Sequence, residues 1–181
     1  MDTATAINTK WAIDPTHSEI HFKVKHMMVS TVTGAFNEFE GTVETKTGDF
    51  AGAAVAFSAK VDSISTNNAQ RDEHLKSDDF FNAAAFPTLS FQSTSFSKNS
   101  DGEYELIGDM TIRDHTQSVK LAVEYNGTVV DPYGQTKAGF EITGKVSRKD
   151  FGLKWSAITE AGGVVVGDEV RLVLNVQLVQ Q

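Results

Sequence analysis

The 181-residue sequence lacks cysteine altogether, contains no long apolar run and is poor in basic residues. Without thiols, the chain forms no disulfide and no thiolate-based catalytic or metal site. A membrane-spanning helix needs about eighteen or more apolar residues in succession, so we predict no transmembrane segment. Lys and Arg number 16 against 24 Asp and Glu, which gives a net charge of −8 with His neutral. Because such a field repels phosphate backbones, we predict no nucleic-acid partner.

Recognisable catalytic and metal-binding motifs are missing as well. The sequence has no serine nucleophile elbow, no phosphate-binding glycine loop and no zinc motif. His17 and His21 lead into a predicted strand, where four residues span roughly 13 Å, so they cannot share one ion. Glu38 and Glu40 share one strand face, whereas a glycosidase needs two carboxylates that face each other across a cleft. We therefore predict that the protein is not an enzyme, holds no metal and uses no cofactor.

The N-terminal residues, MDTATAINTK, contain no basic segment followed by an apolar one, as a signal peptide would. Two interpretations stay open: a cytosolic protein, or a mature or recombinant chain from which a signal has been removed. We expect residues 1–10 to form a tail, either disordered or derived from recombinant expression, and residues 11–181 to form one domain.

Phenylalanine dominates the aromatic residues, with 12 Phe against 3 Tyr and 2 Trp. Since its ring carries no polar group, a large share of phenylalanine indicates a dry interior. A solidly packed core and an apolar ligand-binding interior both account for it, and composition does not separate them.

Alternation of apolar and polar residues is the dominant pattern of the sequence. Ile20, Phe22 and Val24 alternate with polar neighbours, which predicts a half-buried strand over residues 19–26. The three-residue spacing of Phe36 and Phe39 breaks the period and predicts a β-bulge. The same alternation predicts seven further strands, eight in all: 36–45, 55–61, 89–96, 104–112, 119–125, 140–146 and 170–178.

Turn residues and one helical stretch complete the pattern. Turns are predicted at 47–52, 98–102 and 131–134. Asn126-Gly127 fits either a tight turn or a bulge, and we favour the bulge because Asp131-Pro132-Tyr133-Gly134 follows so closely. Asn67 as N-cap and Gln70 three residues later predict a short helix over 69–76.

These elements predict an all-β fold: an extended eight-stranded antiparallel barrel with a short helix that caps one end. Closing the sheet removes its exposed edges. An eight-stranded barrel is either filled by its own side chains or opened to hold one small ligand, and this choice decides the function.

Nine short motifs occur in order between Trp11 and Val179: DPTHS (14–18), GAFNEFEG (34–41), SIST (63–66), RDEHL (71–75), DFF (79–81), FP (86–87), GDMTI (108–112), RKDFG (148–152) and VGDEV (166–170). Together with Phe22 and His26, they resemble the YceI-like family of polyisoprenoid-binding proteins, which have a lipocalin-like barrel. The chain departs from the family pattern at Asp114-His115, where a glycine is common.

The resemblance implies a lumen that encloses the tail of a long-chain isoprenoid lipid, either a polyprenyl pyrophosphate or an isoprenoid quinone. It also implies storage or transport of that lipid, and export to the bacterial periplasm or secretion, with a cytoplasmic location left open. A homodimer is a further open expectation. Two rival functions remain: a ligand-free barrel that acts as a protein-interaction module, and an enzyme that acts on a quinone or prenyl chain.

The alternation then assigns the side chains to the lumen. We predict that the lumen is lined by Ile20, Phe22, Val24, Phe39, Val55, Phe57, Leu89, Phe91, Leu106, Met110, Leu121, Val123, Phe140, Ile142, Leu172 and Leu174. An end or mouth of the barrel is predicted to contain Phe36, Phe80, Phe81, Phe86, Phe151 and Trp155. Arg71, His74 or Arg148 would meet an anionic head-group at a rim. Glycines 41, 108 and 144 either bend the barrel or leave space for a ligand.

Overall fold

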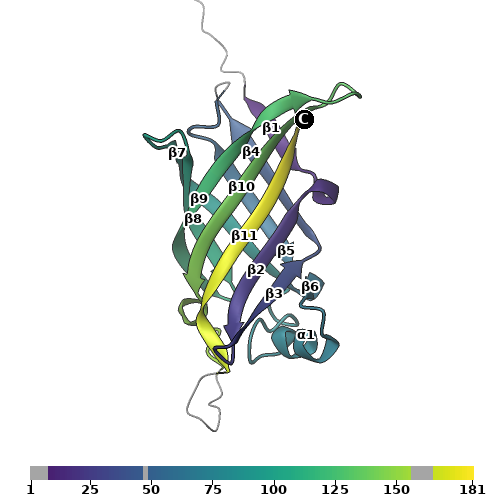
Figure 1. Cartoon of the computed structure of the whole chain (residues 1–181), viewed down its shortest axis with the longest axis vertical. Helices are drawn as coiled ribbons and strands as arrows, with labels where there is room; N and C mark the ends of the chain where they lie inside the picture. The colour runs from purple at the N-terminus through teal and green to yellow at the C-terminus, as the bar shows by residue number, and fades with distance from the viewer. Residues whose placement is uncertain (1–7, 47–48, 156–164) are drawn as a thin grey trace, which may run out of the picture.

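The computed structural model describes residues 8–46, 49–155 and 165–181. The strands among them form one antiparallel sheet in the order β1-β4-β5-β7-β8-β9-β10-β11-β2-β3-β6, and a second pairing between β1 and β11 closes it. Figure 1 shows the resulting elongated barrel. The strands are β1 (Thr9–Ile13), β2 (Glu19–His26), β3 (Ser30–Phe36), β4 (Phe39–Thr45), β5 (Ala54–Lys60), β6 (Ile64–Ser65), β7 (Thr88–Lys98), β8 (Tyr104–Ile112), β9 (His115–Val130), β10 (Thr136–Ser147) and β11 (Val166–Gln180).

The predicted eight-stranded antiparallel barrel is confirmed, and three of its strands are interrupted. β1 and β2 lie one after the other along β11, with Ile13 opposite Leu178 and Glu19 opposite Asn175. The short 3-10 helix η1 (Pro15–His17) separates them. In the same way, β3 pairs with β2 while β4 pairs with β1, and β6 pairs with β3 while β5 pairs with β4.

The bulge predicted between Phe36 and Phe39 is wrong, because the chain leaves β3 at Phe36 and begins β4 at Phe39. The last residue of β5 and the turn that follows it satisfy the backbone at this break. The Asn37 amide donates to the Ser63 carbonyl oxygen over 3.1 Å, and the Lys60 amide donates to the Glu38 carbonyl oxygen over 2.9 Å. The alternation pattern therefore merged the end of one strand with the beginning of the next.

The barrel contains strand residues that the sequence did not predict. β1 includes Thr9 and Lys10, which the sequence assigned to the tail, and β3 runs from Ser30. Residues 1–7 of the predicted tail lie outside the described residues, as do residues 47–48 of the predicted turn.

The favoured bulge at Asn126-Gly127 is confirmed. Gly127 pairs with Gly139 and Tyr125 pairs with Phe140, so Asn126 is the additional residue of β9. Gly127 has φ +119°, a backbone conformation that glycine adopts without a steric penalty.

Helix α1 (Ala69–Lys76) has the predicted bounds, but its N-cap is Asn68 rather than Asn67. Asn68 Oδ1 accepts a hydrogen bond from the Arg71 amide at 3.0 Å, which satisfies one free donor of the first turn. Figure 1 shows the helix beside β6 at one end of the barrel. The segment that follows the helix buries Phe80 and Phe81, at 5% and 9% exposure, and thereby covers this end of the core.

Candidate functional site

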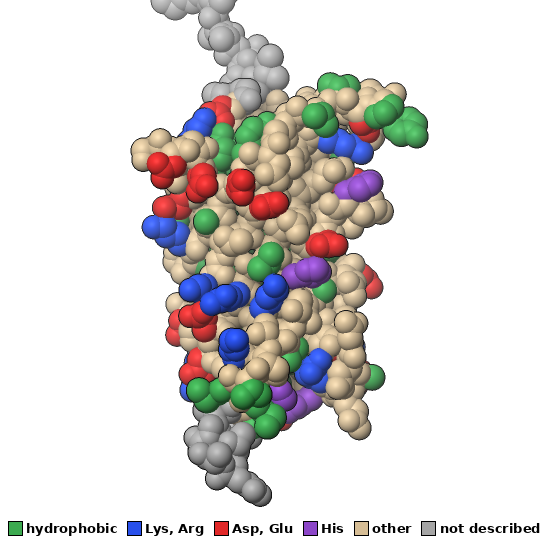
Figure 2. All heavy atoms as spheres, viewed as in Figure 1, with side chains coloured by type: hydrophobic (Ala, Val, Ile, Leu, Met, Phe, Trp, Pro, Cys, Tyr) green, Lys and Arg blue, Asp and Glu red, His purple; other side chains and the backbone are tan. Residues whose placement is uncertain are grey.

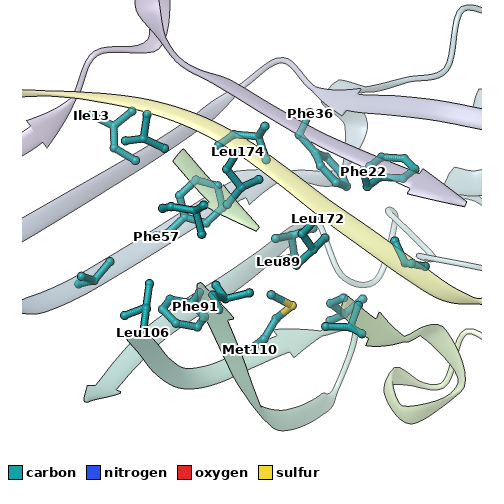
Figure 3. A pocket seen from close by; sticks show the side chains of 18 of the residues that line it. Ile13, Phe22, Phe36, Phe57, Leu89, Phe91, Leu106, Met110, Leu172 and Leu174 are labelled. Atoms are coloured by element: carbon teal, nitrogen blue, oxygen red, sulfur yellow. The ribbon is translucent and has the colours of Figure 1, made fainter. Parts of the chain in front are cut away.

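Inward-pointing side chains from the strands enclose an apolar cavity of about 210 Å³. In Figure 3, Phe22, Phe57 and Leu172, from three different strands, point into the same space. Among the described residues that line the cavity, Thr42 and Arg148 alone carry polar side chains. The barrel is therefore not solidly filled, and its interior offers almost no partner for a polar molecule.

Nineteen of the twenty-two predicted lumen and mouth residues line this cavity; that they contact a ligand stays a prediction. They are Ile20, Phe22, Val24, Phe36, Val55, Phe57, Phe80, Phe81, Leu89, Phe91, Leu106, Met110, Leu121, Val123, Phe140, Ile142, Phe151, Leu172 and Leu174.

Phe39, Phe86 and Trp155 do not line the cavity. The ring of Phe39 lies 6.2 Å from that of Phe57, a lining residue, beside the break between β3 and β4. Phe86 lies under the Arg113 guanidinium at 5.7 Å. Trp155 packs against Phe80 with ring centroids 5.5 Å apart. Phe86 and Trp155 lie outside the strands, where alternation gives no guidance.

Several lining residues were missed, although the sequence contained a signal for many of them. Val170, Val176 and Leu178 continue the alternation of Leu172 and Leu174 along β11, so extending the same face would have included them. Val43 and Val146 likewise continue the inward faces of β4 and β10. The remaining missed residues are Ile13, Thr42, Phe50, Ala56, Leu75, Phe96, Ile112, Leu153 and Val166.

Glycines leave space for large rings of neighbouring strands. A Cβ atom at Gly34 would overlap the ring of Phe22, and one at Gly108 would overlap the ring of Phe91. At Gly41 and Gly144, the space is likewise occupied by side chains of the protein. For Gly41, Gly108 and Gly144, the alternative that they leave room for a ligand is therefore wrong, since side chains of the protein fill that room; that they bend the barrel stays a prediction.

An aromatic group that includes Phe50 closes the end of the barrel opposite α1. Phe50 is 6% exposed, and its ring lies 4.9 Å from Phe140 and 5.3 Å from Trp11. Beside it, the Tyr104 hydroxyl donates a hydrogen bond to Asp49 Oδ1 over 2.6 Å. Burial, and next the bond to Asp49, raise the pKa of Tyr104 to about 12. The same bond lowers the pKa of Asp49.

Arg148 lies at the α1 end, where its side chain is only 4% exposed. Burial lowers its pKa, although Asp168 opposes this effect. A guanidinium has five N–H groups, and here five acceptors surround it. They are the carbonyl oxygens of Leu153 (2.6 Å), Trp155 (2.7 Å), Gly167 (2.9 Å) and Val166 (3.3 Å), and Asp168 Oδ1 (3.5 Å). Arg148 therefore binds the chain on both sides of residues 156–164 and has no donor left for a ligand.

The other two predicted head-group residues are also held by protein partners. Arg71 donates to the side-chain and carbonyl oxygens of Thr66 over 2.7 and 2.6 Å. His74 Nε2 lies 2.8 Å from Asp79 Oδ2. Neither Arg71 nor His74 lines the cavity. All three side chains thus stabilise the α1 end of the barrel.

The described residues contain neither a cluster of metal ligands nor a membrane-spanning helix. In residues 8–46, 49–155 and 165–181, no three His, Asp or Glu side chains come together as metal ligands. His17 contacts Asp14 instead, with 2.8 Å between Nδ1 and Oδ2. Within these ranges, no helix has the length and apolar character needed to cross a bilayer.

Known proteins are similar to this chain in sequence or in architecture. Residues 11–178 match the model of the YceI-like domain. A UPF0312 protein of Staphylococcus aureus is 35% identical over 164 residues, which cover 90% of this chain and 93% of the relative. The crystal structure of BcnA from Burkholderia cenocepacia matches with a TM-score of 0.79 at 19% identity, over 91% of this chain and 98% of that one. A polyisoprenoid-binding domain from Saccharophagus degradans, implicated in plant cell wall breakdown, matches with a TM-score of 0.65 at 13% identity, over 94% of this chain and 98% of the domain.

Proposed function

Because the chain belongs to the YceI-like family, we propose that its barrel binds a long-chain isoprenoid lipid and stores or transports it without chemical conversion. The observation that carries this proposal is the cavity, whose described lining is apolar except for Thr42 and Arg148. The fold shared with the polyisoprenoid-binding domain from Saccharophagus degradans supports the same ligand class.

The size of the cavity suits a slender chain. A cavity of about 210 Å³ has room for on the order of 15 to 20 methylene-sized groups if each needs roughly 10–15 Å³, as a water does. That corresponds to roughly three or four five-carbon isoprene units. A longer tail would either widen the barrel or leave its remainder outside.

Burial of the tail should set the affinity. Each buried methylene contributes about 0.8 kcal/mol, so one isoprene unit contributes roughly 3–4 kcal/mol before the cost of ordering it. A single hydrogen bond to a charged group contributes only about 1.5–3 kcal/mol. Because the hydrogen-bond donors of Arg148 are all engaged, a pyrophosphate would lack a partner inside the barrel. We therefore propose a neutral head-group such as a quinone inside the barrel, or a charged head-group that stays in water at a rim.

Catalysis finds little support in the lining. General acid–base chemistry needs a titratable group within hydrogen-bond reach of the reacting atoms, and the described lining contains no His, Asp, Glu, Lys or Tyr. This composition favours a carrier over an enzyme that acts on a quinone or prenyl chain. Periplasmic location and homodimer formation stay predictions.

Organic extraction of freshly purified protein, followed by mass spectrometry, tests the proposal. We expect an isoprenoid at close to one molecule per chain. A barrel that yields no lipid, and that takes up neither an added isoprenoid quinone nor an added polyprenyl pyrophosphate, would support the protein-interaction module. Turnover of a quinone or prenyl substrate that is lost in His74→Ala, with lipid content unchanged, would support the enzyme.

A further inference from the structure

The hairpin between β2 and β3 ends in an apolar tip made of Met27, Met28 and Val29. These side chains are 48%, 68% and 87% exposed. Both methionines have positive φ, +52° and +61°, in a region that glycine and asparagine occupy more readily. Large apolar side chains thus stand in water at positions where the backbone favours other residues. Figure 1 shows this hairpin at the α1 end of the barrel.

Cations lie directly behind the apolar tip on the outer face of the barrel. Lys145 of β10 is opposite Arg171 of β11, and Arg171 is opposite Lys23 of β2. We call these three residues the basic row. Lys25, also exposed, lies between this row and the tip. Glu169 lies 3.9 Å from Lys145 and 3.8 Å from Arg171, whereas no ion pair joins Lys23 or Lys25 to a carboxylate of the described chain.

The same strands carry the opposite charge toward the other end of the barrel. Glu124 of β9 is opposite Glu141 of β10, and Asn175 of β11 separates Glu141 from Glu19 of β2. This acidic row lies four residues, or roughly 13 Å, from the basic row along each shared strand. Figure 2 shows the two groups apart on this face, with Lys and Arg side chains nearer the α1 end. In a chain of net charge −8, this separation leaves a group of cations on the part of this face that is nearer the α1 end.

The lining of the cavity reaches this same end. Val24, between Lys23 and Lys25 on β2, points inward and lines the cavity, as does Val170, which is opposite it on β11. Val166 also lines the cavity and is opposite His26, the last residue before the apolar tip. The tip, the basic row and the cavity therefore meet at one end of the molecule.

We propose that this end docks on an anionic lipid bilayer, with the apolar tip in the interfacial region and the basic row and Lys25 against the head-groups. The inference rests on the proposed function, because a carrier of an isoprenoid lipid must exchange it with a membrane. Interfacial binding is strongest where apolar side chains enter the boundary region while Lys and Arg meet anionic lipids. Because anionic lipids repel the acidic row, the opposite end of the barrel should face away from the bilayer. The charge pattern therefore also determines the orientation.

Vesicle flotation of the full chain tests the docking. The vesicles contain either phosphatidylcholine with phosphatidylglycerol or phosphatidylcholine alone. We expect binding to the anionic vesicles only, with a loss of roughly tenfold or more in Lys23→Gln/Lys25→Gln, because each surface cation contributes measurably to such binding. Added salt should weaken binding in the same way, since it screens exposed charges. Met27→Ser/Met28→Ser/Val29→Ser should lose binding even at low salt.

The matched control is the hairpin at the acidic end, where Val129 and Val130 are 64% and 68% exposed. Val129→Ser/Val130→Ser should bind anionic vesicles as the parent does. Equal flotation of the tip and control variants, or no flotation of the parent, would overturn the docking. So would a parent dimer that dissociates in the tip variant, since the tip would then contact a second copy.

Lipid extraction from the same preparations separates this inference from the proposed function. Protein that retains an isoprenoid but ignores anionic vesicles overturns the docking alone. Protein that floats with anionic vesicles but holds and takes up no isoprenoid overturns the carrier function.

Discussion

Arg148 donates a hydrogen bond from Nη1 to the carbonyl oxygen of Trp155 over 2.7 Å, although the two residues are seven positions apart in the chain. With its bond to Gly167, this contact connects the end of β10 to the beginning of β11. Arg148→Met should lower the free energy of unfolding by about 3 kcal/mol, because it leaves several buried carbonyl groups without donors. Urea unfolding measures this change.

The control for this prediction is Arg171→Met, since the side chain of Arg171 is 63% exposed. It should change the unfolding free energy by less than about 0.5 kcal/mol. An Arg148→Met protein of unchanged stability that has lost its lipid would instead make Arg148 a head-group ligand, as the sequence suggested.

Phe57→Asp should empty the barrel. Phe57 lines the cavity opposite Phe91 of β7, and a buried carboxylate there has no hydrogen-bond partner to offset its loss of hydration. Lipid extraction measures retention, and circular dichroism shows whether the variant folds. Phe57→Leu, which stays apolar, should retain the lipid. Lys60→Asp, on an exposed side chain of the same strand, should also retain it. Full lipid content in a folded Phe57→Asp protein would show that the faces are assigned wrongly.

Gly34→Ala should narrow the cavity without adding any polar group. The new Cβ would overlap the ring of Phe22, and because this ring lines the cavity, we expect it to shift into the lumen. Overpacking of this kind typically costs about 1–3 kcal/mol of stability. We expect weaker binding of added isoprenoid quinones, most strongly for the longest tails, in a titration that follows tryptophan fluorescence.

Gly139→Ala is the control for this narrowing, because its nearest neighbour would be Asn126 Cβ at 3.7 Å, an ordinary contact. Unchanged quinone binding in both variants would show that the position of the Phe22 ring does not limit the width of the cavity.

Stability at high pH should depend on Tyr104. Its pKa is raised from 10.0 to about 12, so the folded state favours the neutral phenol. The resulting stabilisation is complete below pH 10 and disappears as the pH rises through 12. When the pH is raised from 9 to 11, the melting temperature of the parent should fall further than that of Tyr104→Phe. Thermal unfolding at the two pH values measures both changes. Tyr133, which is 90% exposed, provides the control: Tyr133→Phe should lose as much stability as the parent.

The parts of the fold that follow from a local period were predictable from the sequence. β2 and β8 begin and end where alternation placed them, because a period of two is a property of the strand backbone itself. β1 and β3 were missed because their alternation is short or interrupted by small and polar residues, as in Ser30–Phe36. Their place is fixed by pairing with distant strands.

The same contrast between local pattern and distant contacts explains which residues of the candidate site were predictable. Alternation identified the inward face, so most of the predicted lumen residues line the cavity. Arg148 donates to carbonyl groups as distant in sequence as that of Gly167. No local sequence pattern predicts such contacts. Phe50 closes one end of the barrel from a loop position, where its neighbours are set only by the complete fold.

The pairing of Trp11 with Gln180 has a consequence for biosynthesis. A chain emerging from the ribosome cannot join β1 to β11 until β11 has been synthesised, so closure comes after all other strands of the sheet exist. During that interval, the free edges can pair with other nascent chains, and contacts between such distant residues form slowly. Cells that produce this protein would therefore benefit from chaperones that shield the open sheet until its two ends meet.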